Sequence, residues 1–255
     1  MKRLLNLFAS GKSPPRTAFL ACSPLRLTYV VGDIHGMAAL LERLLAKIET
    51  NRAGAPADLV FVGDYIDRGP ESATVLARVF ELAQNNPMPV TCLLGNHERM
   101  MLDFLDDPAR YGARWLHNGG QETLQSYGIS STARHGADDP LQARAKALRT
   151  ALPDGIEAWL RTLPRLWQSG TLAVVHAAAD PVLALDQQDP DSLIWGHRDF
   201  LTTARHDGIW LAHGHTVVKT ASARSGRISL DTGAYRTGRL TAARIEGGEI
   251  TFLQG

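Results

Sequence analysis

The sequence predicts an α/β domain in which helices cover a β-sheet. From Leu27 onward, short β-branched or apolar runs alternate with amphipathic stretches, and repeated βα units imply this layered arrangement. The 255 residues are 44% hydrophobic and 21% charged, so one core can form without disulfides. A short apolar N-terminal run is interrupted at residues 11–16 by glycine, proline and charge. We therefore expect a flexible leader over residues 1–24 and a single domain over residues 25–255.

Three βα units open the predicted domain. Each pairs an apolar run with a stretch whose leucines or other apolar residues recur every three to four positions, which is typical of a buried strand and an amphipathic helix. The predicted strands span residues 27–31, 59–62 and 90–94, and the helices that follow span residues 37–48, about 72–83, and the region around 100–102.

The rest of the chain contains an insertion and then further strands. Residues from 106 to about 170 are mostly helical and polar in pattern, and we interpret them as an inserted cap or side lobe. The last three predicted strands are short and separated by turns with glycine, which favours an antiparallel meander. Strands are predicted at residues 172–175, 209–212, 227–230, 240–245 and 250–253.

Charge and cysteine usage exclude several function classes. The 27 basic residues nearly balance the 26 acidic ones, which argues against a broad surface for nucleic acid or anionic lipid. No apolar stretch approaches the roughly 20 residues that cross a bilayer. Cys22 and Cys92 are far apart and outside any zinc pattern, which fits a reducing compartment and buried thiols. We expect a cytoplasmic monomer without a nucleic-acid or membrane partner.

Polar residues follow most of the predicted strands directly. Because the carboxyl ends of parallel strands meet at one edge of an α/β sheet, side chains from distant segments can converge there. Neighbouring glycines allow the tight turns that such crowding needs. The five segments are Gly32–Gly36, Gly63–Gly69, Gly95–Glu98, His176 and Gly214–Thr216.

These segments predict a site for two metal ions. A single Gly-Asp pair is usually only a turn, but five such segments together are poorly explained by chance. Carboxylate, amide and imidazole groups suit manganese, iron or zinc, and their number exceeds what one catalytic ion takes. Two ions could share a water, lower its pKa and offset charge on a phosphoryl group. The candidate ligands are Asp33, His35, Asp64, Asn96, His176 and His215.

The remaining histidines are weaker candidates. His117, His135 and His206 lie in polar, turn-rich segments, where we expect surface positions. His213 stays ambiguous, because alternation in an extended segment would place it on the same face as His215.

The motifs Gly32-Asp33-Ile34-His35-Gly36, Gly63-Asp64-Tyr65-Ile66-Asp67-Arg68-Gly69 and Gly95-Asn96-His97-Glu98 resemble the signature blocks of the phosphoprotein phosphatases, within the calcineurin-like metallophosphoesterases. The resemblance extends to His176 and to the segment from Gly214 to Thr216, and it is strongest to bacterial and phage serine/threonine phosphatases. It implies two mixed β-sheets in a sandwich flanked by helices, with the metal ions at one edge.

The resemblance also implies a role for each site residue. Asp33 and His35 would hold the first metal ion, Asp64 would bridge, and Asn96, His176 and His215 would hold the second. The ions would be Mn²⁺, with iron or zinc as alternatives. His97 would protonate the leaving group, Asp67 would orient His97, and Arg68 would bind phosphate through its planar guanidinium.

The sequence departs from the family pattern in two places. The family has a second phosphate-binding arginine two positions after a tryptophan, whereas His197 is two positions after Trp195 and Arg198 is three. We expect Arg198 to take the role, with His197 or a loss of the contact as alternatives. The second departure is a run of alanines after His176, where a glycine is usual.

The implied function is a metal-dependent serine/threonine protein phosphatase. It would hydrolyse a phosphate monoester of a phosphoprotein or phosphopeptide by direct attack of hydroxide held by the two metal ions. A cysteine nucleophile is excluded, because neither cysteine is followed by arginine at the sixth position. One alternative is a symmetrical dinucleoside tetraphosphatase, which has Ala-Arg-Gly in place of Asp67-Arg68-Gly69 and Asn-His-Asp in place of Asn96-His97-Glu98. The other is an inactive phosphate-binding module.

Overall fold

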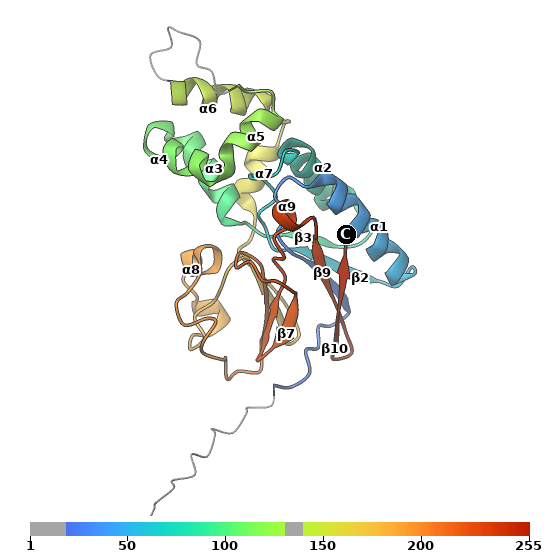
Figure 1. Ribbon diagram of the computed structural model, residues 1–255. Coiled ribbons are helices and arrows are strands. Elements are labelled where there is room, and N and C mark those ends of the chain that lie inside the picture. The colour runs from blue at the N-terminus through green and yellow to red at the C-terminus, as the bar shows by residue number, and fades with distance from the viewer. Residues whose placement is uncertain (1–18, 131–139) are drawn as a thin grey trace, which may run out of the picture.

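The computed structural model describes residues 19–130 and 140–255, which form two five-stranded sheets and the helices around them (Figure 1). The strands are β1 (Leu27–Val31), β2 (Ala57–Phe61), β3 (Val90–Cys92), β4 (Leu166–Ser169), β5 (Leu172–Val175), β6 (Trp210–His213), β7 (Ser222–Arg224), β8 (Arg227–Ser229), β9 (Thr241–Glu246) and β10 (Glu249–Gln254). The helices are α1 (Ala38–Arg52), α2 (Ser72–Asn85), α3 (Asn96–Asp106), α4 (Pro108–Trp115), η1 (Leu116–Gly120), α5 (Gln121–Ser126), α6 (Pro140–Ala151), α7 (Ile156–Thr162), η2 (Leu185–Gln187), α8 (Pro190–Trp195) and α9 (Ala234–Thr237).

Both sheets are mixed, as the family resemblance implies. The first has the order β10-β9-β1-β2-β3, in which β1, β2 and β3 are parallel and β9 is antiparallel to β1 and β10. The second has the order β4-β5-β6-β8-β7, with β5, β6 and β8 parallel and antiparallel strands at both edges. Each sheet therefore has three parallel strands that deliver loops from their carboxyl ends.

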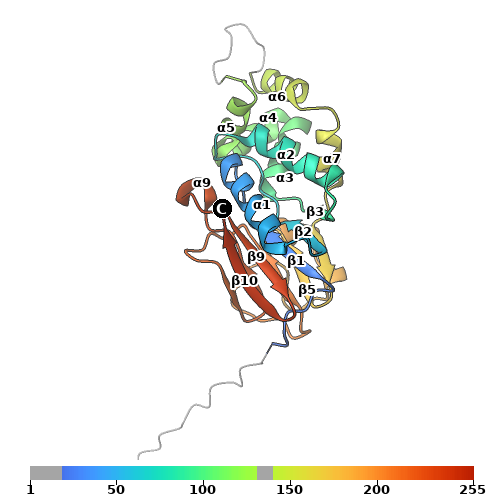
Figure 2. The ribbon, with the colours of Figure 1, turned by 90° about the vertical axis from the view of Figure 1, so that its right-hand side faces the viewer.

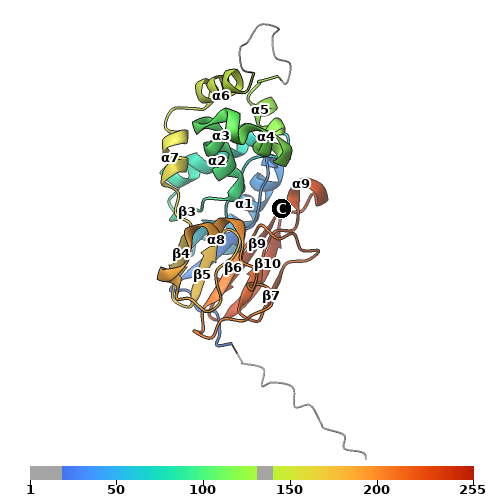
Figure 3. The ribbon, with the colours of Figure 1, turned by 90° about the vertical axis from the view of Figure 1, so that its left-hand side faces the viewer.

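Strand β1 is buried on both faces, which explains its unbroken apolar sequence. Val30 packs with Val174 and Ile228 between the two sheets, whereas Tyr29 and Val31 belong to the core beneath the helices. Helix α1 covers the outer face of the first sheet (Figure 2), and α8 lies beside the second (Figure 3). The structure is a sandwich of two sheets flanked by helices.

Two features of the predicted topology are wrong. The last strands form no single meander, because β8 belongs to the second sheet while β9 and β10 pair in the first. The eleven residues 230–240 that connect β8 to β9 contain α9, so this connection crosses between the sheets and is not a hairpin. Strands β4 and β7 and helices α8 and α9 were not predicted from the sequence. Strand β4 lies within the predicted insertion, so the helical insertion ends with α7 and not near residue 170.

The insertion and the predicted leader both pack on the rest of the chain where they are described. Helices α3 to α6 gather at one end of the sandwich (Figure 1). Cys22, within the predicted leader, is buried and forms a β-bridge with Gly248. Residues 1–18 of the leader, and His135, lie outside the described residues.

Among the described helices, none combines the length and the apolar character needed to cross a membrane.

Candidate metal centre

The six predicted ligands come together from five loops, each following a parallel strand or opening the helix after it. Five of them have side chains that are almost fully buried, and His215 is partly exposed. The predicted surface histidines behave differently, since His117 and His206 are exposed. Convergence at one sandwich edge follows from the parallel order of the strands that carry these loops.

The backbone of these loops is held in an unusual conformation. Among the described residues, seven non-glycine residues have positive φ, and five of them are predicted site residues. Such backbone persists only where the surroundings hold it, and it clusters at functional sites. Gly63 shows how close the loops lie, because a Cβ there would be 2.6 Å from the backbone nitrogen of Gly95. The five site residues with positive φ are His35, Asp64, Asp67, Arg68 and His215.

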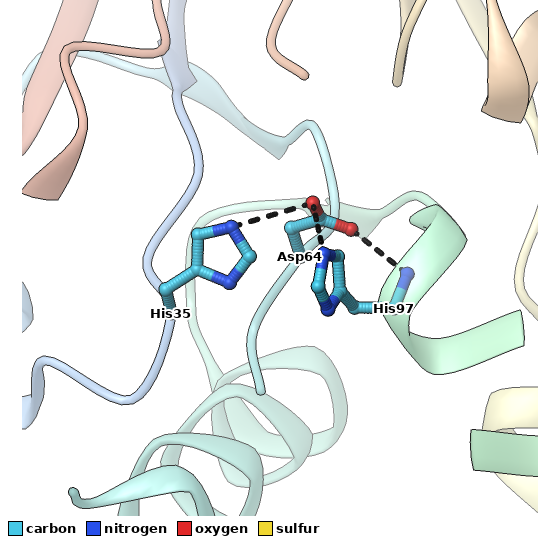
Figure 4. Close-up of side chains that lie close together, drawn as sticks. All are labelled: His35, Asp64 and His97. Carbon is cyan, nitrogen blue, oxygen red and sulfur yellow. Dashed lines mark hydrogen bonds and ion pairs between the residues drawn. The ribbon is translucent and has the colours of Figure 1, made fainter. Parts of the chain in front are cut away.

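Asp64 stands at the centre of the cluster. Its Oδ2 lies 3.5 Å from His35 Nε2 and 3.9 Å from His97 Nε2, while its Oδ1 lies 3.3 Å from His176 Nε2. Figure 4 shows the carboxylate between the rings of His35 and His97, with the backbone nitrogen of His97 donating to Oδ1. One carboxylate therefore joins two potential metal-binding groups, His35–Asp64–His97 and Asp64–His176–His215.

Backbone carbonyls select the ring nitrogens that face the centre. His35 Nδ1 lies 2.8 Å from the carbonyl oxygen of Ile66, and His176 Nδ1 lies 3.0 Å from that of Val62. With the proton on each Nδ1, the Nε2 lone pairs point inward, which is the usual arrangement of metal-binding histidines. His176 Nε2 lies 2.9 Å from Asn96 Oδ1, so two electron-pair donors face each other. A cation between them satisfies both, and these residues fit a metal ion.

Burial shifts the pKa values of the aspartates and of the histidines in opposite directions, and both shifts favour the neutral side chains. It raises the pKa of Asp33 and Asp64 well above the carboxyl range, and lowers the pKa of His35 and His176 below the imidazole range. The cause is that a low-dielectric interior disfavours charged groups. Divalent cations require ionised carboxylates and neutral imidazoles, so cation binding would restore charge to the aspartates and keep the histidines neutral.

His97 and Asp67 form a buried pair beside Asp64. His97 Nδ1 lies 2.7 Å from Asp67 Oδ2, and both side chains are at most 1% exposed. Trp115 Nε1 donates to the same oxygen over 3.0 Å, and Thr123 Oγ1 donates to Oδ1 over 2.6 Å. The helical insertion thus supplies two of the three side chains that hold Asp67.

Arg68 lies at the same centre. Its Nη1 is 3.1 Å from His35 Nε2, and its guanidinium lies 5.1 Å from the centre of the Tyr235 ring. Its backbone nitrogen donates to the carbonyl of Gly119, at the kink within η1. The insertion therefore holds the backbone of Arg68 as well as the carboxylate of Asp67.

Other residues considered from the sequence lie outside this buried cluster. The Arg198 side chain is 90% exposed, with Nε 3.4 Å from its neighbour Asp199, and His197 Nε2 lies 3.5 Å from Asp180. His213 is buried, but its ring nitrogens contact Gly214 O and Ser229 Oγ, each at 3.0 Å. These contacts resolve the ambiguity of His213 in favour of a structural role.

The structural role of Glu98 was not predicted from the sequence. Its carboxylate is fully buried and accepts hydrogen bonds from four backbone nitrogens, at distances of 2.8–3.3 Å. The donors are Asp64, Tyr65, Ile66 and Gly95. Glu98 is the third residue of α3 after the N-cap Gly95, a position where a glutamate typically reaches back to the cap, and this signal could have been read. Trp115 and Thr123 carried no comparable signal.

The sequence matches the calcineurin-like phosphoesterase family over residues 27–219. It is 33% identical over 233 residues to serine/threonine-protein phosphatase 1 of Salmonella typhimurium, covering 87% of this chain and 93% of that protein. It is also 24% identical over 238 residues to the asymmetrical bis(5'-nucleosyl)-tetraphosphatase PrpE of Oceanobacillus iheyensis, covering 85% and 87%.

Solved structures share the fold. A protein tyrosine phosphatase from a psychrophilic Shewanella species superposes with a TM-score of 0.54 at 17% identity, covering 90% of this chain and 80% of that chain. This likeness supports the sandwich architecture.

Proposed function

Because the chain belongs to the calcineurin-like phosphoesterase family, and is thus a hydrolase, we propose that it is a metal-dependent serine/threonine protein phosphatase. The observation that carries the proposal is the buried contact of Asp67 with His97. Asp67 belongs to the motif Asp67-Arg68-Gly69, which distinguishes protein phosphatases from the symmetrical tetraphosphatases that the sequence resembles. The 33% identity to a serine/threonine-protein phosphatase supports the same substrate class.

The proposed metal ligands divide into two sets. Asp33 and His35 would hold one ion, and Asn96, His176 and His215 would hold the other. Asp64 would serve both, since its two oxygens face His35 and His176. We propose Mn²⁺, with iron or zinc as alternatives that the same ligand types accept. Two divalent ions here would lower the pKa of a water and offset the charge of the phosphoryl group.

The other residues act on the substrate. His97 protonates the leaving oxygen, and Asp67 holds its Nδ1 so that Nε2 faces the centre. Arg68 binds the phosphoryl oxygens through its guanidinium, which Tyr235 supports. Arg198 is proposed as a second contact to the phosphorylated substrate, because its exposed ion pair with Asp199 contributes little and breaks readily.

A dinucleoside tetraphosphatase is the second candidate. It is favoured by relatives such as PrpE of Oceanobacillus iheyensis, and by a 76-residue match at 43% identity to a symmetrical bis(5'-nucleosyl)-tetraphosphatase of a Janthinobacterium species, covering 29% of this chain and 25% of that protein. The same centre could hydrolyse either substrate, since fold and metal site alone do not select it.

Parallel hydrolysis assays distinguish the two candidates. The purified, manganese-loaded protein is given a phosphoserine peptide, diadenosine tetraphosphate and an aryl phosphate, with His97→Asn as a control for contaminating phosphatases. We expect the highest kcat/KM for the phosphoserine peptide. A higher value for the dinucleotide would replace the proposal with the second candidate, and hydrolysis of none would refute both.

We also propose a cytoplasmic location and a monomer. Both cysteines are free and buried, which fits a reducing compartment. Measuring the molecular mass in solution tests the second point.

A further inference from the structure

Asp231 is a buried carboxylate with an oxygen that no described group satisfies. The residue is 1% exposed, and its Oδ1 accepts a hydrogen bond from the backbone nitrogen of Gly233 over 2.8 Å. Its Oδ2 has no hydrogen-bond partner among the described residues. A buried polar atom without a partner is costly, so its retention calls for an explanation.

The chain places Asp231 at the metal-binding edge. It follows β8, which is parallel to β6, and β6 leads directly to the loop of His215. The preceding residue, Leu230, lies against Gly32, where a Cβ would be 2.6 Å from the Leu230 carbonyl oxygen. Gly32 directly precedes Asp33 in the sequence, so Asp231 comes from a sixth loop that adjoins the loop of Asp33.

Asp231 and Asp33 are both almost fully buried, and they follow directly on the adjoining residues Leu230 and Gly32. Two buried carboxylates on adjoining loops are costly unless a cation lies near them. A cation at this edge would also satisfy the unpartnered Oδ2 of Asp231.

We propose that Asp231 is a positioning residue for the cation that Asp33 and His35 would hold, and that the negative charge of its unpartnered Oδ2 stabilises that cation. This inference rests on the proposed metal centre and adds a residue outside the five segments that supply the proposed ligands. Groups outside the direct ligands commonly tune metal affinity by 10–100-fold. Asp231 would therefore strengthen binding at one end of the centre and leave the other end unaffected.

The test compares Mn²⁺ binding by wild-type protein and Asp231→Asn, using calorimetry and metal analysis after dialysis. The amide keeps the acceptor for Gly233 but removes the charge. We expect two ions per wild-type chain, and in the variant a Kd about 10–100-fold higher for one ion only. Unchanged affinities for both ions would overturn the inference.

A neighbouring variant separates charge from loop structure. Thr232 Oγ1 bonds to Arg239 O and lies 2.9 Å from Thr241 Oγ1, so Thr232→Val disturbs the same loop without changing charge. Thr232→Val should bind both ions as the wild type does. If Thr232→Val weakens Mn²⁺ binding as much as Asp231→Asn does, the effect belongs to the loop structure and the inference is refuted. If Asp231→Asn does not fold, Asp231→Ser keeps an acceptor and takes its place, with the same two outcomes. Failure of wild-type protein to bind two ions would refute the proposed centre itself.

Discussion

Asp67 Oδ2 accepts a hydrogen bond from His97 Nδ1 over 2.7 Å, and both residues are buried at the edge of the proposed metal centre. Burial raises the pKa of Asp67, whereas the hydrogen bonds from Thr123 and Trp115 lower it. These donors favour the ionised carboxylate that His97 needs as a partner. The insertion therefore contributes to the electrostatics of the site.

Trp115→Phe tests this contribution, because it removes the Nε1 donor and keeps an aromatic ring. Without that hydrogen bond the pKa of Asp67 rises, so the carboxylate is protonated at a higher pH. We expect kcat to fall about tenfold with KM unchanged, as for other residues that orient a catalytic group, and the acid limb of the pH–kcat profile to shift to higher pH.

Trp159→Phe is the matched control. Trp159 packs on Phe80 and Tyr65 at ring-centre distances of 5.2 and 6.5 Å and makes no contact with Asp67 among those described. The pH–kcat profile of Trp159→Phe should match that of the wild type. If kcat falls in Trp115→Phe but the acid limb of its profile does not shift, the proposed effect on Asp67 is contradicted.

Glu98→Gln should destabilise the fold. A glutamine amide keeps one acceptor oxygen, so two of the four backbone donors lose their acceptor. Each buried donor left unsatisfied costs about 1–3 kcal/mol, so the free energy of unfolding should fall by roughly 2–6 kcal/mol. Urea denaturation with a chelator present measures this without a contribution from bound metal.

Glu81→Gln provides the comparison for Glu98. Glu81 is 61% exposed and pairs with Arg78 over 2.8 Å, and exposed pairs contribute at most about 1 kcal/mol. If both substitutions cost the same, Glu98 is not the anchor of the Asp64 loop.

The convergence of the site residues could be predicted from the sequence, because most of the predicted strands are followed directly by polar residues. The apolar run Leu27–Val31 ends directly before Gly32 and Asp33, and the same adjacency brings His176 after β5. Once the parallel strands are identified, the rule for their carboxyl ends places these side chains at one edge.

Contacts between distant segments could not be predicted in this way. Trp115 and Thr123 are 48 and 56 residues from Asp67, and neither has a local pattern that points to it. The sheet to which β8 belongs depends on whether the connection to β9 turns back or crosses over, and turn residues alone do not decide this. The positive φ values of Asp64 and Arg68 are likewise imposed by tertiary packing.

His97 can be tested as a proton donor against the possibility that it binds metal. It stands with His35 and Asp64 in one of the two potential metal-binding groups. We expect His97→Asn to bind two ions per chain while kcat falls by about 10²–10⁴-fold, the usual contribution of general acid catalysis. Asp64→Asn should lose at least one ion, since Asp64 is shared by both groups. Metal analysis and kinetics measure both effects.

Asp58→Asn controls for the loss of an acidic residue. Asp58 lies in β2 and pairs with Arg26 over 3.5 Å. The Asp58→Asn variant should still bind both ions. Loss of one ion from His97→Asn would make His97 a ligand and reassign the proton donor.

Arg68 and Arg198 should differ in kinetic effect. Hydrogen bonds to charged groups contribute about 1.5–3 kcal/mol, so Arg68→Ala should lower kcat/KM for a phosphopeptide by about 10–100-fold. Arg198→Ala should raise KM about threefold at constant kcat, because its exposed side chain forms a weaker contact. Arg224→Ala, which removes an exposed arginine of β7, should change neither constant. An unchanged KM in Arg198→Ala would remove Arg198 from the substrate site.

The two thiols should be almost unreactive in the folded protein. Burial raises the pKa of both Cys22 and Cys92 from 9.0 to about 12, so at pH 8 the reactive thiolate is about a thousandfold rarer than in the unfolded chain. Alkylation by iodoacetamide, followed by mass spectrometry, should be slower by at least that factor in the native protein, since burial also blocks access. In urea both thiols should react rapidly, and Cys22→Ser and Cys92→Ser assign each site. Rapid native alkylation that abolishes phosphatase activity would contradict the exclusion of a cysteine nucleophile, on which the choice of a metal-dependent mechanism partly depends.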